Sequence, residues 1–309
     1  MKKDFVIGTR GSKLALWQAE FVRARLSEIY PSVEIRLEII KTSGDKLQNV
    51  SLSVIGGQGV FTKELETALL DCRIDLAVHS LKDLPTVLPA DLFISAVLPR
   101  ENASDALVAR KDLQIASLAE LPLNSIVGTS SIRRAAQLKN LRPDLQIRDL
   151  RGNVGTRLDK LDNGNYDVIM LAVAGLKRLN LENRISAVFS ANEMLPQVGQ
   201  GALGIETRRG DVETNNLVAV LKDQETTACV FAERAFLRGL GGGCQFPIAA
   251  NARIENDKLF LDGLVAEPSG AQILRGQIAG ETANAETLGE KLANKLLDKG
   301  ARELINQSL

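Results

Sequence analysis

Aromatic residues are scarce in this sequence: they make up 4% of the 309 positions, and there is a single histidine, His79. So few aromatic rings leave no stacking platform for single-stranded nucleic acid. Lysine and arginine (38) balance aspartate and glutamate (38), which gives a formal net charge of zero. Proteins that hold nucleic acid through overall charge are basic, so no nucleic-acid partner is expected.

Cysteine is also rare, with only Cys72, Cys229 and Cys244. An odd number without metal-ligand spacing supports neither a disulfide framework nor a Cys/His zinc site, so no metal is expected. No hydrophobic run approaches the length of a membrane span. The N-terminus carries two lysines without an apolar run behind them, which is not the pattern of a secretory signal. We therefore expect a soluble cytoplasmic protein with no membrane partner.

Phosphate-binding fingerprints are missing as well. The sequence contains no G-x-x-x-x-G-K-[ST] string. Residues 199–204 fit G-x-G-x-x-G, but they lead into a predicted strand and not into a helix, so a dinucleotide site is not expected there.

What the sequence does contain is the length and patterning of two or three globular domains. Two successive α/β series are followed, from about Glu225, by a helix, antiparallel strands and an amphipathic helix over 286–306, which is typical of a small α+β domain. The polar stretch 99–105 is interpreted as a crossing between domains. Expected strands cover 5–9, 33–42, 74–78, 92–98, 125–129, 145–150, 168–173, 203–206, 249–255, 258–266 and 272–279.

Polar and cationic residues recur where a strand passes into a helix. The four turns carry Arg10/Ser12, Ser80/Lys82/Asp83, Thr129/Ser131/Arg133/Arg134 and Arg151/Thr156/Arg157. Each alone could be a capped helix beside a solvated charge. Together they lie at the ends of strands where open α/β sheets bind ligands. Cations in a first helical turn oppose the helix dipole, so an anion is expected to compensate them. Because the arginine fork pairs with carboxylates, we infer a small ligand with several anionic groups.

Two residues are candidates for chemistry. Cys244 follows three glycines and precedes Phe246-Pro247, which places a thiol on a tight, stiffened loop. It could be a buried core cysteine or a reactive thiol. Asp83 could form a surface pair with Lys82, or it could be a catalytic carboxylate with a cationic neighbour. His79 and Cys229, both among apolar residues, are expected to be structural.

Several long motifs resemble those of one family. They are RGSKLALWQA from Arg10, DLAVHSLKDLP from Asp75, VGTSSIRRAAQL from Val127, IRDLRGNVGTRLDKL from Ile147, LAVAGLKRL from Leu171, PQVGQGALGIE from Pro196 and GGCQFPIAA from Gly242. The sequence is similar to the porphobilinogen deaminase family, also called hydroxymethylbilane synthase, over nearly its whole length.

The resemblance implies an enzyme, a transferase of tetrapyrrole (haem) biosynthesis. It would join four porphobilinogen molecules head to tail with loss of four ammonia, giving linear hydroxymethylbilane. It implies a dipyrromethane cofactor attached to Cys244 through a thioether, and Asp83 as the catalytic carboxylate, which stabilises the cation left when ammonia departs. By similarity the cofactor also contacts Ser12, Lys82, Asp83, Thr129, Ser131, Arg133, Arg134, Gly199 and Gln200. Substrate carboxylates would meet Arg10, Ser12, Arg151, Arg157 and Arg178.

The family resemblance also implies a fold and a working state. Two periplasmic-binding-protein-like, doubly wound α/β domains would precede a small α+β domain that carries the cofactor cysteine. We place domain 1 at 1–99 and 200–219, domain 2 at 104–195 and domain 3 at 223–309. A cytoplasmic monomer that uses neither metal nor nucleotide is expected.

Two positions depart from the family pattern. Gln58 stands where the family commonly has a lysine in a mobile loop, which puts a cationic role there in doubt. Gly241 replaces an acidic residue that often precedes Gly-Gly-Cys. Two other functions remain as alternatives: a binding module that captures a carboxylate ligand without chemistry, and a phosphate-ester enzyme that uses the same basic turns.

Overall fold

The computed structural model describes residues 2–42, 62–243 and 246–306. The chain divides into two compact units, each assembled from two segments. Unit 1 combines residues 1–101 with 202–227, and unit 2 combines residues 102–201 with 228–309. Gln58 and Cys244, two positions of the sequence analysis, lie outside the described residues.

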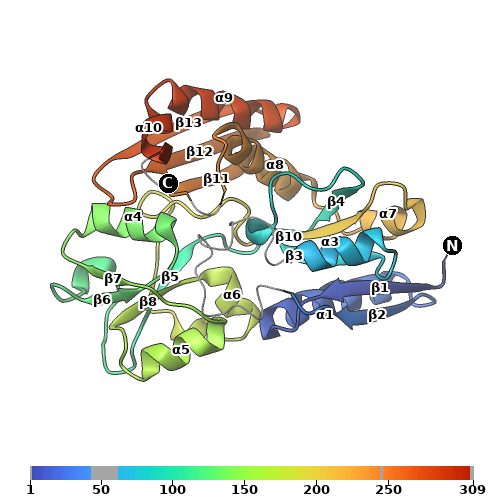
Figure 1. Cartoon of the computed structure of the whole chain (residues 1–309), viewed down its shortest axis with the longest axis horizontal. Helices are drawn as coiled ribbons and strands as arrows, with labels where there is room; N and C mark the ends of the chain where they lie inside the picture. The colour runs from blue at the N-terminus through green and yellow to red at the C-terminus, as the bar shows by residue number, and fades with distance from the viewer. Residues whose placement is uncertain (1, 43–61, 244–245, 307–309) are drawn as a thin grey trace. The chain divides into compact units, whose positions relative to one another are not determined.

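Unit 1 is built on one mixed five-stranded sheet, whose strands are blue, teal and yellow in Figure 1. Its strand order is β2-β1-β3-β10-β4. The strands are β1 (Asp4–Thr9), β2 (Glu34–Ile39), β3 (Leu76–Ser80), β4 (Leu92–Val97) and β10 (Leu203–Arg208). β1 runs parallel to β2 and β3, whereas β10 is antiparallel to both β3 and β4. A strand from the second segment therefore lies inside the sheet of the first.

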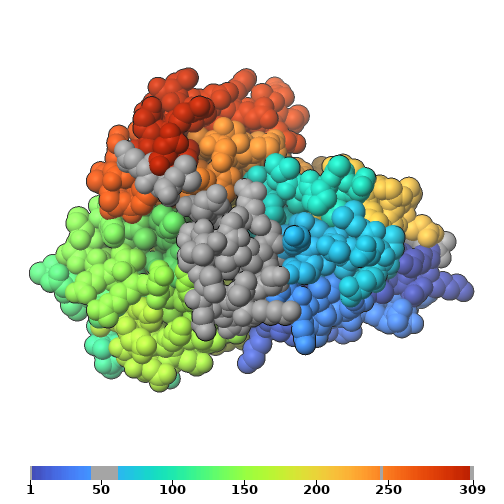
Figure 2. Space-filling model, in the orientation of Figure 1, coloured from blue at the N-terminus to red at the C-terminus, as the bar shows by residue number. Residues whose placement is uncertain are grey.

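Helices cover both faces of this sheet. They are α1 (Lys13–Ile29), α3 (Lys63–Leu70) and α7 (Val212–Ala219). Phe5, Ile7 and Leu76 pack in one cluster with residues of α1 and α7, while the alternate residue Ala77 packs with α3 on the other side. Side chains alternate between faces along a strand, so the sheet is doubly wound. Figure 2 shows the yellow residues of the second segment directly beside the blue and cyan residues of the first.

The first part of unit 2 repeats this design. Its sheet has the order β7-β6-β8-β5-β9, in which β6 is parallel to β7 and β8, and β5 is antiparallel to β8 and β9. The strands are β5 (Asp105–Ala109), β6 (Ile126–Gly128), β7 (Gln146–Arg148), β8 (Val168–Ala172) and β9 (Ala187–Val188). Leu138 of α4 (Ile132–Leu141) packs on one face, and residues of α5 (Val154–Asp162) and α6 (Val173–Arg178) pack on the other.

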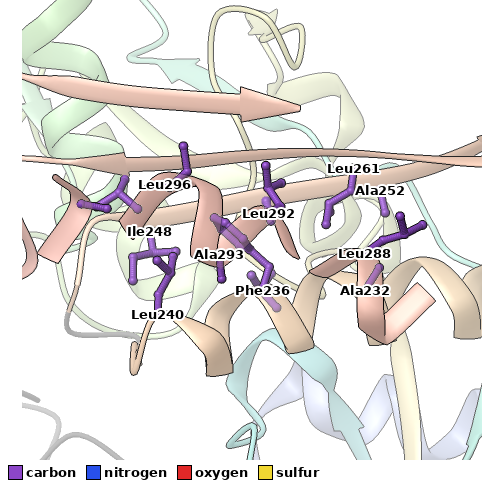
Figure 3. Packing of buried hydrophobic residues seen from close by; sticks show 14 of the residues in the cluster. Ala232, Phe236, Leu240, Ile248, Ala252, Leu261, Leu288, Leu292, Ala293 and Leu296 are labelled. Carbon is purple, nitrogen blue, oxygen red and sulfur yellow. The ribbon is translucent and has the colours of Figure 1, made fainter. Parts of the chain in front are cut away.

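The C-terminal part of unit 2 is an antiparallel meander with helices against it. Its elements are β11 (Ile248–Glu255), β12 (Lys258–Ala266), β13 (Ile273–Glu281), α9 (Ala285–Leu297), α10 (Ala301–Asn306) and, from residue 228 on, α8 (Gln224–Gly239). In Figure 3, Leu288, Leu292 and Leu296 of α9 share one buried cluster with Phe236 of α8. The leucines lie above strand glycines: a Cβ added to Gly280 would meet Leu288 Cδ2 at 2.8 Å.

The predicted fold class is confirmed: two doubly wound α/β sheets are followed by a small α+β part. Two strands, β5 and β9, and two α-helices, α6 and α7, were not expected from the sequence. The prediction of a single helix over 286–306 was wrong. Gly300 has φ +94° and separates α9 from α10. The predicted domain boundaries stay a prediction.

Candidate active site

The predicted residues of unit 1 gather at the carboxyl ends of two neighbouring parallel strands. Arg10 and Ser12 follow β1, and Lys82 and Asp83 follow β3, which is paired with β1. Ser12 has extended backbone angles and accepts a hydrogen bond from Ala15 N at 3.3 Å, which makes it the N-cap of α1. The described first turn of α1 holds no acidic residue, so its positive dipole end remains uncompensated by its own side chains.

A short 3₁₀ turn over Leu81–Asp83 holds the candidate catalytic carboxylate. Leu81 is buried and its N–H donates to Ala202 O at 3.1 Å. Its side chain rests on Gly204 of β10, where an added Cβ would meet Leu81 Cδ2 at 2.3 Å. Only glycine permits this close approach. The turn is thus fixed by Leu81, while Lys82 is half-buried and Asp83 is exposed.

Two buried polar residues, Gln18 and His79, make side-chain hydrogen bonds close to the start of this turn. Gln18 of α1 donates from Nε2 to Ser80 Oγ at 2.8 Å. His79 lies on β3 with its Nε2 2.9 Å from Glu206 Oε2 of β10, and both side chains are buried. His79 is therefore part of the packed sheet, in line with the structural role expected for it. Gln18 was not singled out from the sequence, where it looks like one more polar helix residue.

The predicted residues of unit 2 occupy the equivalent edge of the second sheet. Thr129 and Ser131 follow β6, and Arg151 follows β7. Ser131 Oγ accepts from Arg134 N at 3.4 Å and caps α4; Asn153 caps α5 in the same way through Thr156 N at 2.9 Å. As in α1, the described first turns of α4 and α5 contain no acidic residue. Three helix N-termini thus open beside cationic or hydroxyl side chains, an arrangement suited to anions.

Arg133 and Arg134 converge on one buried carboxylate, Asp105 at the start of β5. Arg134 donates from Nε (3.0 Å) and Nη2 (2.6 Å) to Asp105 Oδ1, and from Nη1 to Met170 O at 3.0 Å. Arg133 Nη2 lies 2.8 Å from Asp105 Oδ2, and its Nη1 donates to Leu195 O at 2.7 Å. The anion expected to compensate these first-turn cations is therefore supplied, at least for one charge, by the protein itself.

The charges of this cluster do not cancel. Burial alone would raise the pKa of Asp105, but the guanidinium groups of Arg133 and Arg134 outweigh it and hold the pKa well below its usual range. Asp105 is thus ionised and carries one negative charge against two positive ones. Burial lowers the pKa of Arg133, with Asp105 opposing that effect. Among the described residues, Arg133 Nε is buried without a hydrogen-bond acceptor. This buried donor fits a group that carries carboxylates, as a dipyrromethane does.

Two other arginines of the site, Arg157 and Arg178, donate to backbone carbonyl groups. Arg157 Nε donates to Gly152 O at 2.8 Å, and Gly152 adopts φ +116° to present that carbonyl. Arg178 is buried and donates from Nη2 to Gly201 O at 2.7 Å. Arg151 is partly exposed. Such anchoring fixes the direction of the planar fork.

Gly199 and Gln200 lie in a buried turn between two carboxylates. Gln200 Nε2 donates to Asp105 Oδ1 at 2.9 Å and to Ala103 O at 2.6 Å. Gly199 N donates to Glu233 Oε2 of α8 at 2.7 Å, and Glu233 Oε1 accepts from Ala252 N of β11 at 2.8 Å. Gly199 and Gly201 have φ +72° and +88°. The segment then enters strand β10, so the G-x-G-x-x-G string opens no helix here, as expected.

The chain leaves α8 towards Cys244 through a defined C-terminal cap. Gly242 N donates to Leu237 O at 3.1 Å and Gly241 N to Arg238 O at 2.9 Å, with Gly241 at φ +66°. This is the Schellman pattern, in which a left-handed glycine ends the helix. Glycine adopts this left-handed conformation without the strain that a side chain would add. Gly242 allows Ile248 to approach, since a Cβ there would meet Ile248 Cδ1 at 2.4 Å.

Cys229 is buried in the cluster that α8 shares with β11 and α9, as expected for a core residue. Within the described ranges, no group of three potential metal ligands comes together. None of the helices in those ranges is long and apolar enough to span a membrane.

Sequence reasoning missed Asp105 and Glu233. Asp105 ends a polar connector and begins an apolar run, and nothing in its neighbours marks it as buried. Glu233 has helical periodicity with apolar residues around it, which was the only available signal of burial.

Several solved structures are similar to this chain. The methionine-binding protein MetQ is 14% identical, with 71% of this chain and 89% of that chain covered and a TM-score of 0.46. The periplasmic VFT2 domain of Bordetella pertussis BvgS is 13% identical, with 70% and 86% covered and a TM-score of 0.44. An arginine-specific periplasmic binding protein of Salmonella typhimurium is 12% identical, with 73% and 94% covered and a TM-score of 0.41.

Two family descriptions match the sequence itself. "Porphobilinogen deaminase, dipyromethane cofactor binding domain" matches residues 5–216, and "Porphobilinogen deaminase, C-terminal domain" matches residues 227–298. The two matches follow each other in order and together cover nearly the whole chain, including every candidate site residue. The chain belongs to the porphobilinogen deaminase family and contains its dipyrromethane cofactor-binding domain.

Proposed function

We propose that the protein is a hydroxymethylbilane synthase, a cytoplasmic monomer. It joins four porphobilinogen molecules head to tail, releases four ammonia and takes up one water to form linear hydroxymethylbilane. The observation that carries the proposal is the repeated strand-to-helix turn. Three capped helices without first-turn acids, α1, α4 and α5, begin beside cationic side chains. Each pyrrole of such a chain carries an acetate and a propionate, which are the anions these turns suit.

The dipyrromethane would be held by Cys244 as a thioether and by the turns around Arg133, Arg134 and Gln200. When bound, it supplies the tethered primer on which the product grows. Ser12, Lys82, Thr129, Ser131 and Gly199 complete the set of residues assigned to it. The buried Arg133 Nε without a described acceptor supports this assignment.

Asp83 is proposed as the catalytic carboxylate. Loss of ammonia from the aminomethyl group of porphobilinogen leaves a cation, and a carboxylate near the pyrrole N–H stabilises that charge and accepts protons. The exposed position of Asp83 on a turn fixed by Leu81 supports this role, because the carboxylate can reach a ligand without displacing packed atoms. Arg10, Arg151, Arg157 and Arg178 would bind the acetate and propionate groups of incoming and growing chains.

Intact-protein mass spectrometry tests the proposal. Purified protein supplied with porphobilinogen should exceed the mass of the bare polypeptide by two linked pyrrole units, and hydroxymethylbilane should accumulate in the solution. A Cys244→Ala variant is the control and should keep the bare mass. A wild-type chain that keeps the bare mass and forms no product would refute the proposal and favour a binding module.

A further inference from the structure

Asp105 is in contact with three of the residues assigned to the cofactor. Its carboxylate pairs with the guanidinium groups of Arg133 and Arg134 and accepts from Gln200 Nε2. All four side chains are at least nine-tenths buried, with Asp105 and Gln200 fully so. No role at the site was assigned to Asp105 from the sequence or the family match.

The contacts come from three separate parts of unit 2. Asp105 begins β5, the two arginines lie in the first turn of α4, and Gln200 lies in the turn before β10. Asp105 Oδ1 accepts from both Arg134 and Gln200, and Oδ2 faces Arg133. A single carboxylate is therefore shared by two guanidinium groups and one side-chain amide that come from distant parts of the sequence.

The two arginines of this cluster differ in how many of their N–H groups have an acceptor. Arg134 uses Nε, Nη1 and Nη2 for acceptors within unit 2. Arg133 has a buried Nε without a described acceptor, and one positive charge of the cluster is not balanced by Asp105. A ligand carboxylate would complete both the hydrogen bonding and the charge.

We propose that Asp105 is a positioning residue for the cofactor site. By holding Arg133, Arg134 and Gln200 in one arrangement, it presents Arg133 to a carboxylate of the dipyrromethane and determines how fast the unloaded chain acquires that group. The inference rests on the proposed function. It adds that the rate at which the chain acquires the dipyrromethane depends on the position of the Asp105 carboxylate as well as on its charge.

The experiment compares unloaded wild-type protein with Asp105→Asn and Asp105→Glu. Each is mixed with porphobilinogen, and the fraction of chains carrying the added mass is followed with time by mass spectrometry. Thermal unfolding and circular dichroism of the unloaded chains report folding separately. Asp112→Asn is the matched control, since Asp112 pairs with Arg110 at the surface of the same unit.

We expect Asp105→Asn to lower Tm by roughly 5–15 °C, because it leaves buried guanidinium charge unpaired. Asp105→Glu keeps the charge but moves the carboxylate by one methylene. At a temperature where its circular dichroism matches that of the wild type, it should load at least about 10-fold more slowly, since misplacement of about 1 Å has effects of that size or larger. Asp112→Asn should load at the wild-type rate.

The alternative is that Asp105 serves only as a counter-charge. In that case Asp105→Glu loads at the wild-type rate once folded, and this result would overturn the inference even if Asp105→Asn fails to fold. If the wild type itself gains no mass, the proposed function fails instead, so the two failures are distinguishable.

Discussion

Helix packing in the C-terminal part of the protein can be tested at one glycine. Gly289 lies in the interior of α9 and is buried against α8. A Cβ at this position would meet Ala232 O at 2.2 Å, Ala235 Cβ at 2.8 Å and Phe236 N at 2.8 Å. Two of these three atoms belong to the backbone of α8, so they cannot rotate away as a side chain could. Gly289→Ala therefore requires α8 and α9 to separate.

Two effects of Gly289→Ala oppose each other. Alanine improves helix propensity by up to about 1 kcal/mol relative to glycine. An ordinary C···O contact is about 3.3–3.6 Å, so the helices must separate by about 1 Å. Overpacking of this kind costs about 1–3 kcal/mol, and rigid backbone partners favour the upper end of that range. We expect net destabilisation of about 1–2 kcal/mol, or a Tm lowered by roughly 2–8 °C.

Thermal and urea unfolding of the unloaded chain measure this effect. Gly155→Ala is the matched control, because Gly155 is also helical but exposed, with Asn153 Oδ1 at 3.4 Å as its nearest neighbour. That variant should be as stable as the wild type or slightly more stable. If Gly289→Ala unfolds at or above the wild-type Tm, the close α8–α9 contact described here is wrong.

Three further substitutions test the site and the sheet beneath it. Asp83→Asn should fold and carry the cofactor yet turn over at least about 100-fold more slowly, as expected for loss of an acid–base group; near-normal hydroxymethylbilane formation would remove Asp83 from the mechanism. Arg157→Ala should slow chain elongation about 10-fold or more, since a substrate carboxylate loses a charged partner, whereas exposed Arg148→Ala should not; equal rates for the two would contradict the carboxylate assignment. Burial raises the pKa of Glu66 above 4.5, so its contribution to stability is present below pH 4.5 and lost as pH rises through the folded pKa. Glu66→Gln should therefore raise the urea midpoint at pH 7 and leave it unchanged near pH 4, and a destabilised variant at pH 7 would refute this reasoning.

The sequence predicted most of the elements, because their hydrophobic periodicity is set by local patterns. Apolar runs such as 168–173 and the capped helix after Ser12 appear where they were expected. Strand β5 was missed because only four apolar residues follow Asp105 and the preceding stretch is polar. The break at Gly300 was missed because the apolar pattern continues across it.

The site was less accessible to prediction than the fold. The strand-to-helix turns could be found from the sequence, since each combines a capping residue with a nearby cation. The contacts of Arg134 and Gln200 with Asp105 could not be found from the sequence, because Asp105 is separated from Arg134 by 29 positions and from Gln200 by 95. Contacts of this kind are created by the sheet order, which places β5 beside β8 and brings distant segments to one carboxylate.

The position of β10 has a consequence for how this protein is made. During translation, β1 to β4 leave the ribosome first, but the strand that joins β3 to β4 follows only after the 102–201 segment. At about 5–20 residues per second, the nascent β3 and β4 edges wait roughly 5–20 s for their partner. Unpaired edges invite pairing with other chains, so protection by chaperones is most valuable in this interval. A fragment that stops at residue 101 would keep those edges open permanently.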